Sequence, residues 1–147
     1  MVAHNAALKA EWGAARYPEA TVLAADTTVC IDNQALNKPR DLAEARGMLL
    51  RLGGRTHTVF TGIAVRRRAD ALALDEGVAS EVTFRPLDAR TIDDYLARVN
   101  PLDKAGGYAI QEHGEMIVAS YSGSFTNIVG LPLEATKQIL TRCGYQA

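Results

Sequence analysis

The chain alternates between segments whose apolar residues recur at helical spacing and segments rich in β-branched residues. The helical spacing predicts helices at residues 5–16, 42–52, 92–99 and 132–140. The β-rich segments predict strands at residues 21–31, 56–68, 77–85, 108–111 and 116–121. Because helices and strands follow one another along the whole chain, the pattern predicts a single α/β domain with a mixed sheet over residues 1–147.

Local signals sharpen some of these boundaries. Asp41 is expected to cap the second helix and Gly53 to follow its end, while Thr91 is expected to cap the third. Residues 69–76 are polar and rich in alanine, so we expect them to form the loop of a long hairpin. The run 66–68, three arginines, is then expected to be a solvated strand end.

Composition narrows the function classes. The chain is 48% hydrophobic and 22% charged, and its 16 Lys+Arg against 17 Asp+Glu give a net charge of −1. That balance argues against the broad basic face that binds polymeric nucleic acid. No basic and apolar leader opens the sequence, no apolar run is long enough to span a membrane, and Cys30 and Cys143 are far apart. We therefore expect a cytoplasmic protein with no membrane partner.

Two charged residues stand out by their surroundings. Asp26 follows Val22-Leu23-Ala24-Ala25 in a predicted strand, where a carboxylate is costly to desolvate without a metal ion, a cation or several donors beside it. A polar strand end explains it equally well. Lys38 precedes Pro39, which favours an extended backbone, and an ammonium there would suit a polyphosphate. An ordinary lysine on a surface loop is the simpler interpretation.

Two further segments could bind a ligand. In residues 103–111 the pair Gly106-Gly107 would let a backbone approach a ligand closely, and Gln111 offers both a donor and an acceptor. The alternative is a glycine turn that leads into a strand. The hydroxyls of residues 122–127 fit helix capping better than binding. His57 and His113 lack a partner at metal-ligand spacing and favour structural roles.

Taken in order, these strings resemble the Maf family of nucleoside triphosphate pyrophosphatases. The resemblance depends most on PLDKAGGYAIQ at 101–111, followed by GSFTNIVGLPL at 123–133. It implies an α/β fold of the Maf/inosine triphosphatase-like type, and hydrolysis of a nucleoside triphosphate to the monophosphate and pyrophosphate with Mg²⁺ or Mn²⁺. It also implies a homodimer. The strings at 54–57 and 105–111 are more similar to the branch that acts on dTTP and UTP.

The same resemblance assigns roles to single residues. Asp26 falls on the acidic position that serves as proton acceptor or metal ligand. Lys9 and Lys38 match lysines near the phosphates, and Thr27 and Gln111 match positions associated with the choice of base. A carboxylate that orients water, together with cations that neutralise phosphate charge, suits attack on the α-phosphorus.

One part of the family pattern has no counterpart in the sequence. Members open with a strand and a Ser-x-Ser-Pro-Arg-Arg loop, whereas the match here starts near Leu8, so we expect an N-terminally shortened member. Arginine forks bind phosphate strongly, and their loss would weaken substrate positioning. The alternative hypothesis is therefore a catalytically inactive nucleotide-binding or dimeric interaction module derived from the same fold.

Overall fold

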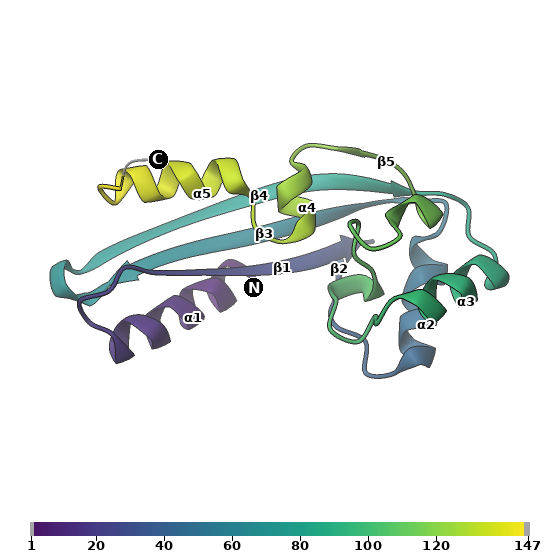
Figure 1. Ribbon diagram of the computed structural model, residues 1–147, viewed down its shortest axis with the longest axis horizontal. Helices are drawn as coiled ribbons and strands as arrows, with labels where there is room; N and C mark the ends of the chain where they lie inside the picture. Colours follow the sequence, from purple (N-terminus) through teal and green to yellow (C-terminus); the bar gives the residue numbers. More distant parts are fainter. Residues whose placement is uncertain (1, 146–147) are drawn as a thin grey trace. The chain divides into compact units, whose positions relative to one another are not determined.

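The computed structural model describes residues 2–145 and confirms the predicted α/β class (Figure 1). Its sheet is antiparallel and not mixed as predicted, with the strand order β2-β1-β3-β4-β5. The strands are β1 (Val22–Ile31), β2 (Gln34–Leu36), β3 (Thr56–Arg67), β4 (Leu72–Phe84) and β5 (Val118–Ser122). The α-helices are α1 (Val2–Arg16), α2 (Leu42–Leu52), α3 (Ala89–Arg98), α4 (Phe125–Val129) and α5 (Leu133–Arg142). Within the described residues, no helix is both long enough and apolar enough to cross a membrane.

The chain forms two compact units, each with more contacts inside it than with the rest. The first unit holds the residues up to Thr27, Phe60–Ala79 and the residues from Thr126 onward. The second holds Thr28–Val59 and Ser80–Phe125. Strands β1, β3 and β4 contribute residues to both units.

In the first unit, two helices cover opposite faces of the strands (Figure 1). Successive side chains of a strand point to opposite faces, so β3 presents Ala64 to one face and its neighbours Ile63 and Val65 to the other. Ala64 packs with Ala6 and Ala10 of α1, and the other two pack with α5. A Cβ on Gly62 would lie 2.9 Å from the Cα atom of Ala3, so the glycine allows the backbone of α1 to approach β3 closely.

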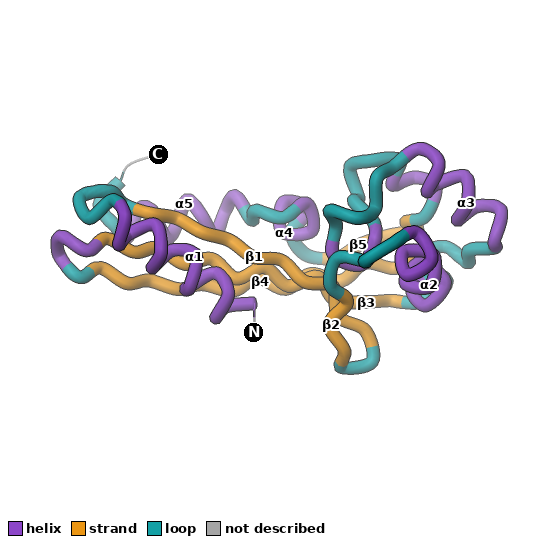
Figure 2. The backbone as a smooth tube through the Cα atoms, turned by 90° about the horizontal axis from the view of Figure 1, so that it is seen from below, coloured by secondary structure: helices purple, strands orange, loops and turns teal. Residues whose placement is uncertain are grey.

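In the second unit, local signals determine the turns and helix ends. Asp32 and Asn33 both adopt positive φ, at 53° and 61°, and join β1 to the short strand β2 in a tight hairpin (Figure 2). The Asp41 carboxylate accepts a hydrogen bond of 2.8 Å from the amide of Glu44, which caps α2 as predicted. In the first unit, the last predicted helix is also confirmed, with α5 beginning directly after Pro132.

Two predicted boundaries are wrong, and one predicted strand is absent. Strand β4 begins at Leu72, inside the predicted loop, because Leu72 and Leu74 pack against the α5 face of the first unit. Helix α3 begins earlier than predicted, since Asp88 rather than Thr91 is its cap. Residues 108–111, predicted as a strand, form no strand.

The predicted arginine strand end is also wrong for Arg66. Its side chain is buried, and its guanidinium contacts Glu11 at 2.6 Å and Asp75 at 2.8 Å. Hydrogen bonds to both carboxylates raise the pKa of Arg66, with that to Asp75 contributing most. The two partners lie 55 and 9 residues away in sequence, so the charge run alone gave no sign of them.

Candidate functional site

Asp26 lies in β1 and is held by two side chains of α1. The Nζ atom of Lys9 donates to Oδ1 at 3.2 Å, and the Nδ2 atom of Asn5 donates to Oδ2 at 3.2 Å. Asn5 and Lys9 are four residues apart, so both face the same side of the helix. The side chains of Lys9 and Asp26 are 58% and 25% exposed, so the carboxylate is half-buried while its lysine partner is open to water.

Small residues bring this carboxylate close to α1. Ala24 packs against the cluster of Ala6, Ala10 and Ala64, and Asp26 is two residues further along β1 on the same face. Asp26 therefore lies beside the apolar contact between α1 and the strand. This position explains how a carboxylate is tolerated in an apolar strand, because the neighbouring helix supplies a cation and an amide donor.

Thr27 points to the opposite face of β1, as the alternation of a strand requires. Its hydroxyl lies 2.8 Å from the hydroxyl of Thr61 and donates to the carbonyl oxygen of Gly130 at 3.3 Å. Thr61 in turn accepts a hydrogen bond of 2.8 Å from Nδ2 of Asn127. The structure thus places Thr27 in a polar network with the segment around α4, and Asp26 with α1.

The segment after β5 supports the capping interpretation of its hydroxyls. Thr126 Oγ1 accepts a hydrogen bond of 3.0 Å from the amide of Leu133, the first residue of α5. The hydroxyl therefore helps to satisfy the open N-terminal end of that helix.

Lys38 and Gln111 belong to the second unit, and both side chains are exposed. The amide of Gly106 donates to the carbonyl oxygen of Asn37 at 3.3 Å, which ties the glycine loop to the backbone just before Lys38. Gly106 adopts φ 75°, and a Cβ there would lie 3.1 Å from Val29. The glycine is thus required by close packing on β1.

Two buried phenols anchor the loop that leads to Gln111. The Tyr108 hydroxyl lies 2.6 Å from His57 Nε2, and both rings pack edge-on against Phe84. The Tyr95 hydroxyl accepts from the amide of Ala109 at 3.2 Å and donates to its carbonyl oxygen at 3.3 Å. Burial raises the pKa of both phenols and lowers the pKa of His57 to about 4, so His57 is neutral at pH 7.

Lys104 closes the same loop from its other side. Its Nζ atom contacts the carbonyl oxygen of Asn100 at 2.9 Å, Asp103 at 2.8 Å and Glu112 at 3.0 Å. Desolvation lowers the pKa of Lys104, but the hydrogen bonds and charges of the two carboxylates outweigh it and raise the pKa overall. Because Glu112 directly follows Gln111, this ammonium restrains the backbone beside the exposed amide.

Sequence reasoning missed Asn5, Tyr95 and Lys104. Asn5 lies one turn before Lys9, but its role is recognisable only once α1 is placed against β1. The contacts of Tyr95 and Lys104 depend on how the loop folds back on α3.

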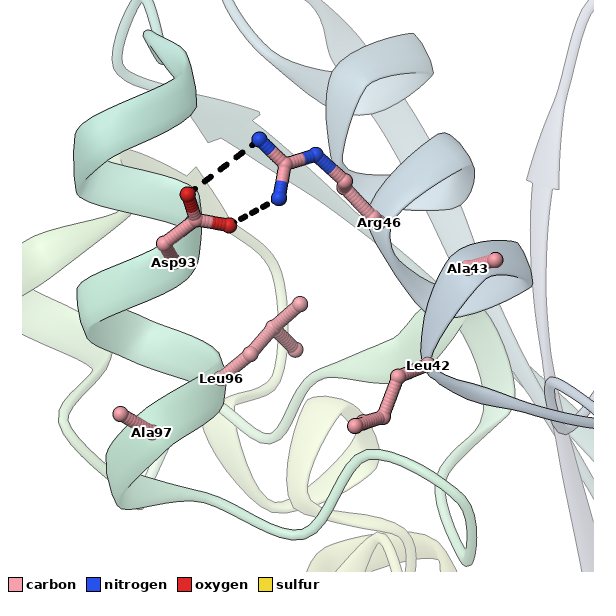
Figure 3. A pocket seen from close by; sticks show the side chains of 6 residues that line it. All are labelled: Leu42, Ala43, Arg46, Asp93, Leu96 and Ala97. Carbon is pink, nitrogen blue, oxygen red and sulfur yellow. Dashed lines mark hydrogen bonds and ion pairs between the residues drawn. The ribbon is translucent and has the colours of Figure 1, made fainter.

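The second unit also has a groove of about 490 Å³ between α2 and α3 (Figure 3). Its lining residues are Leu42, Ala43, Arg46, Asp93, Leu96 and Ala97. Arg46 and Asp93 pair with each other across it, with Nη2 at 3.2 Å from Oδ2. The groove contains none of the predicted site residues, and its charges are already paired.

Comparison with known proteins agrees with the resemblance of the sequence to the Maf family. The family model described as Maf-like protein matches residues 1–143. The chain belongs to the Maf family. A Maf relative from Akkermansia muciniphila, named dTTP/UTP pyrophosphatase, is 46% identical over 98% of this chain and 75% of its own length.

Two further Maf relatives carry the same name. The protein from Myxococcus xanthus is 48% identical over 92% of this chain and 68% of its own length. That from Symbiobacterium thermophilum is 46% identical over 99% of this chain and 74% of its own length. The resemblance inferred from the sequence is therefore confirmed at the level of the family.

The donor set at Asp26 limits what kind of metal site this Maf chain could form. Across residues 2–145 there is no group of three or more His, Cys, Asp or Glu side chains that could enclose a metal ion. Mg²⁺, however, commonly binds through one or two carboxylates and takes its other ligands from water and substrate phosphates. A single accessible carboxylate fits an ion of that kind and does not fit a protein-enclosed structural metal.

Proposed function

We propose that this chain hydrolyses dTTP or UTP to the nucleoside monophosphate and pyrophosphate, with Mg²⁺ or Mn²⁺ as cofactor. The relatives' shared name supports the substrate class. The observation that carries the proposal is the half-buried Asp26 carboxylate held against Lys9. This pair provides an acceptor for a proton and a cation for phosphate on one face of β1.

The chemistry assigns separate tasks to the two residues. Asp26 orients a water molecule and accepts its proton as the water oxygen bonds to the α-phosphorus. The bond from the α-phosphorus to the bridging oxygen breaks, and pyrophosphate leaves with that electron pair. Lys9 has three N–H donors, so it can bind a phosphate oxygen while one donor stays on Asp26. When bound, the divalent ion neutralises phosphate charge and can take Asp26 as a ligand.

Three more residues carry proposed roles in substrate binding. Lys38 is a second cation for the phosphates, and its side chain is exposed. Gln111 reads the edge of the base through its amide, which can both donate and accept. Thr27 is proposed to influence the choice of base through the position of the backbone, because its hydroxyl contacts Thr61 and Gly130.

The direct test is pyrophosphate release from dTTP and UTP, with Mg²⁺ or Mn²⁺ and with EDTA. Asp26→Asn should abolish turnover, because the amide neither accepts the proton nor carries charge. Asp94→Asn, on the exposed side of α3, is the matched control and should leave turnover unchanged. Full turnover by Asp26→Asn would disprove the proposal, and nucleotide binding without turnover by the wild-type chain would favour the inactive nucleotide-binding module.

We also propose that the protein is a homodimer and acts in the cytoplasm, as the family resemblance implies. Light scattering at several protein concentrations tests the dimer, and a constant monomer mass would contradict it. Fractionation of cells that express the protein tests the compartment.

A further inference from the structure

We propose that Asn5 is a positioning residue that holds the Asp26 carboxylate in its reactive orientation, an inference that rests on the proposed function. The observation is that the two carboxylate oxygens have different donors. Oδ1 accepts from Lys9 and Oδ2 accepts from Nδ2 of Asn5, each at 3.2 Å. A carboxylate with a donor on each oxygen cannot rotate without breaking one of the two hydrogen bonds.

The support for Asn5 is built into the packing of α1. Ala6, the next residue, is fully buried against Ala64, and the backbone of Ala3 lies against Gly62. These contacts fix the helix turn that carries Asn5 relative to β3. The amide therefore reaches Asp26 from a short side chain on a fixed backbone.

The two donors are suited to different tasks. Lys9 has a long, flexible side chain that is mostly exposed, and the proposed function gives it the phosphates as partners. Asn5 has only two side-chain torsions and loses less freedom when it is ordered. The terminal torsion of an aspartate is broad, so a carboxylate that lost Asn5 would sample other orientations whenever Lys9 turned toward phosphate.

Three variants of Asn5 test the inference, because it predicts the order of their kcat values. Asn5→Ala removes the donor and should lower kcat about tenfold with little change in KM, because orientation and not substrate binding is lost. Asn5→Asp has nearly the same shape but places a second carboxylate beside Asp26, so it should lower kcat by about a hundredfold. Asn5→Gln keeps an amide donor and should recover part of the turnover lost in Asn5→Ala.

Two measurements separate positioning from a structural role. His4→Ala, at the exposed neighbouring position of α1, is the control and should keep the wild-type kcat. The melting temperature of every Asn5 variant should stay near that of the wild type, and calorimetry with α,β-methylene UTP should give an unchanged Kd for Asn5→Ala. If Asn5 had a merely structural role, its variants would have a lower melting temperature, and kcat of Asn5→Asp would not fall below that of Asn5→Ala.

The outcomes distinguish this inference from the proposed function. If the wild-type chain turns over and Asp26→Asn does not, but Asn5→Ala and Asn5→Asp keep full kcat, then the inference is wrong and the proposed function stands. If the wild-type chain releases no pyrophosphate, the proposed function fails and takes the inference with it. Both are supported if kcat is highest for the wild type, lower for Asn5→Ala and lowest for Asn5→Asp, while Kd stays constant.

Discussion

The carboxylate of the first unit and the glycine loop of the second are held in opposite ways. Asp26 is oriented by charged and polar side chains that remain in contact with water. The loop before Gln111 is anchored by a neutral hydrogen bond between His57 and Tyr108, both buried under Phe84. Water screens the first set of contacts, so they contribute little to stability, whereas the second set is rigid because a buried polar atom without a partner is costly.

This difference predicts that changes in the two regions separate activity from stability. Variants at the carboxylate should change turnover and leave folding intact. Variants at the loop anchor should mainly lower the free energy of unfolding. The predictions that follow test this contrast, beginning with the largest expected change in stability.

The strongest test is the loss of stability in mild acid. Burial lowers the pKa of His57 from 6.5 to about 4, so the unfolded chain takes up a proton in a pH range where the folded chain does not. The stabilising contribution is complete above pH 6.5 and is lost as the pH falls toward 4, by roughly 3 kcal/mol in total. Urea unfolding at intervals between pH 7 and pH 4 measures it.

A variant isolates the histidine from other titrating groups. His57→Gln keeps a polar side chain without a proton to gain, so its free energy of unfolding should depend less on pH between 6.5 and 4. Carboxylates with lowered pKa values, such as Asp32 and Asp103, titrate in both proteins and cancel in the difference. Equal pH dependence in the two proteins would show that His57 is not the group responsible.

The partner of His57 gives the next largest effect. Tyr108→Phe removes the hydroxyl and leaves Nε2 buried without its partner, which should cost about 2 kcal/mol of unfolding free energy. Within the described residues Nδ1 already lacks a hydrogen bond, so the loss of the Tyr108 hydroxyl removes the one hydrogen bond recorded for the ring. Tyr121→Phe, at a half-exposed position, is the control for losing a hydroxyl. Similar unfolding curves for the two variants would contradict a rigid anchor.

The difference between the two regions also explains what sequence could predict. Helix α2 was predicted with its cap because Asp41, Glu44 and the glycines at its end lie within the segment itself. The α/β class followed in the same way from local periodicity. The loop at 108–111 was mistaken for a strand because the hydrogen bonds that fold it, to His57 and Tyr95, come from residues 51 and 14 positions away.

The candidate site shows the same division. Asp26 stood out locally, as a carboxylate among apolar strand residues. Its pairing with Lys9 and Asn5 spans 17 and 21 residues and depends on the packing of alanines between α1 and β3. No local pattern encodes that packing, so Lys9 was predicted only through the family resemblance and Asn5 was not predicted at all.

An intermediate effect is expected at the ion-pair side of the loop. Lys104→Met keeps most of the apolar side chain but removes the ammonium that joins Asn100, Asp103 and Glu112. Since the side chains of Asp103 and Glu112 are 66% and 45% exposed, the loss should be only about 1 kcal/mol. Lys137→Met, on the exposed side of α5, should change the unfolding midpoint far less. If Lys104→Met and Lys137→Met had equal unfolding midpoints, the loop would be held rigid by the two phenols alone.

The smallest change in stability is expected where the effect on activity is large. Lys9→Met removes a half-exposed ion pair, and such pairs contribute little, so the unfolding free energy should change by less than about 0.5 kcal/mol. The same variant should raise KM for UTP roughly tenfold or more, because a charge-assisted contact with phosphate is lost. The two effects are measured on one preparation, by urea unfolding and by pyrophosphate release. If Lys9→Met destabilised the fold as strongly as Tyr108→Phe, Lys9 would be a structural residue like the loop anchors, and an unchanged KM would remove it from the substrate site.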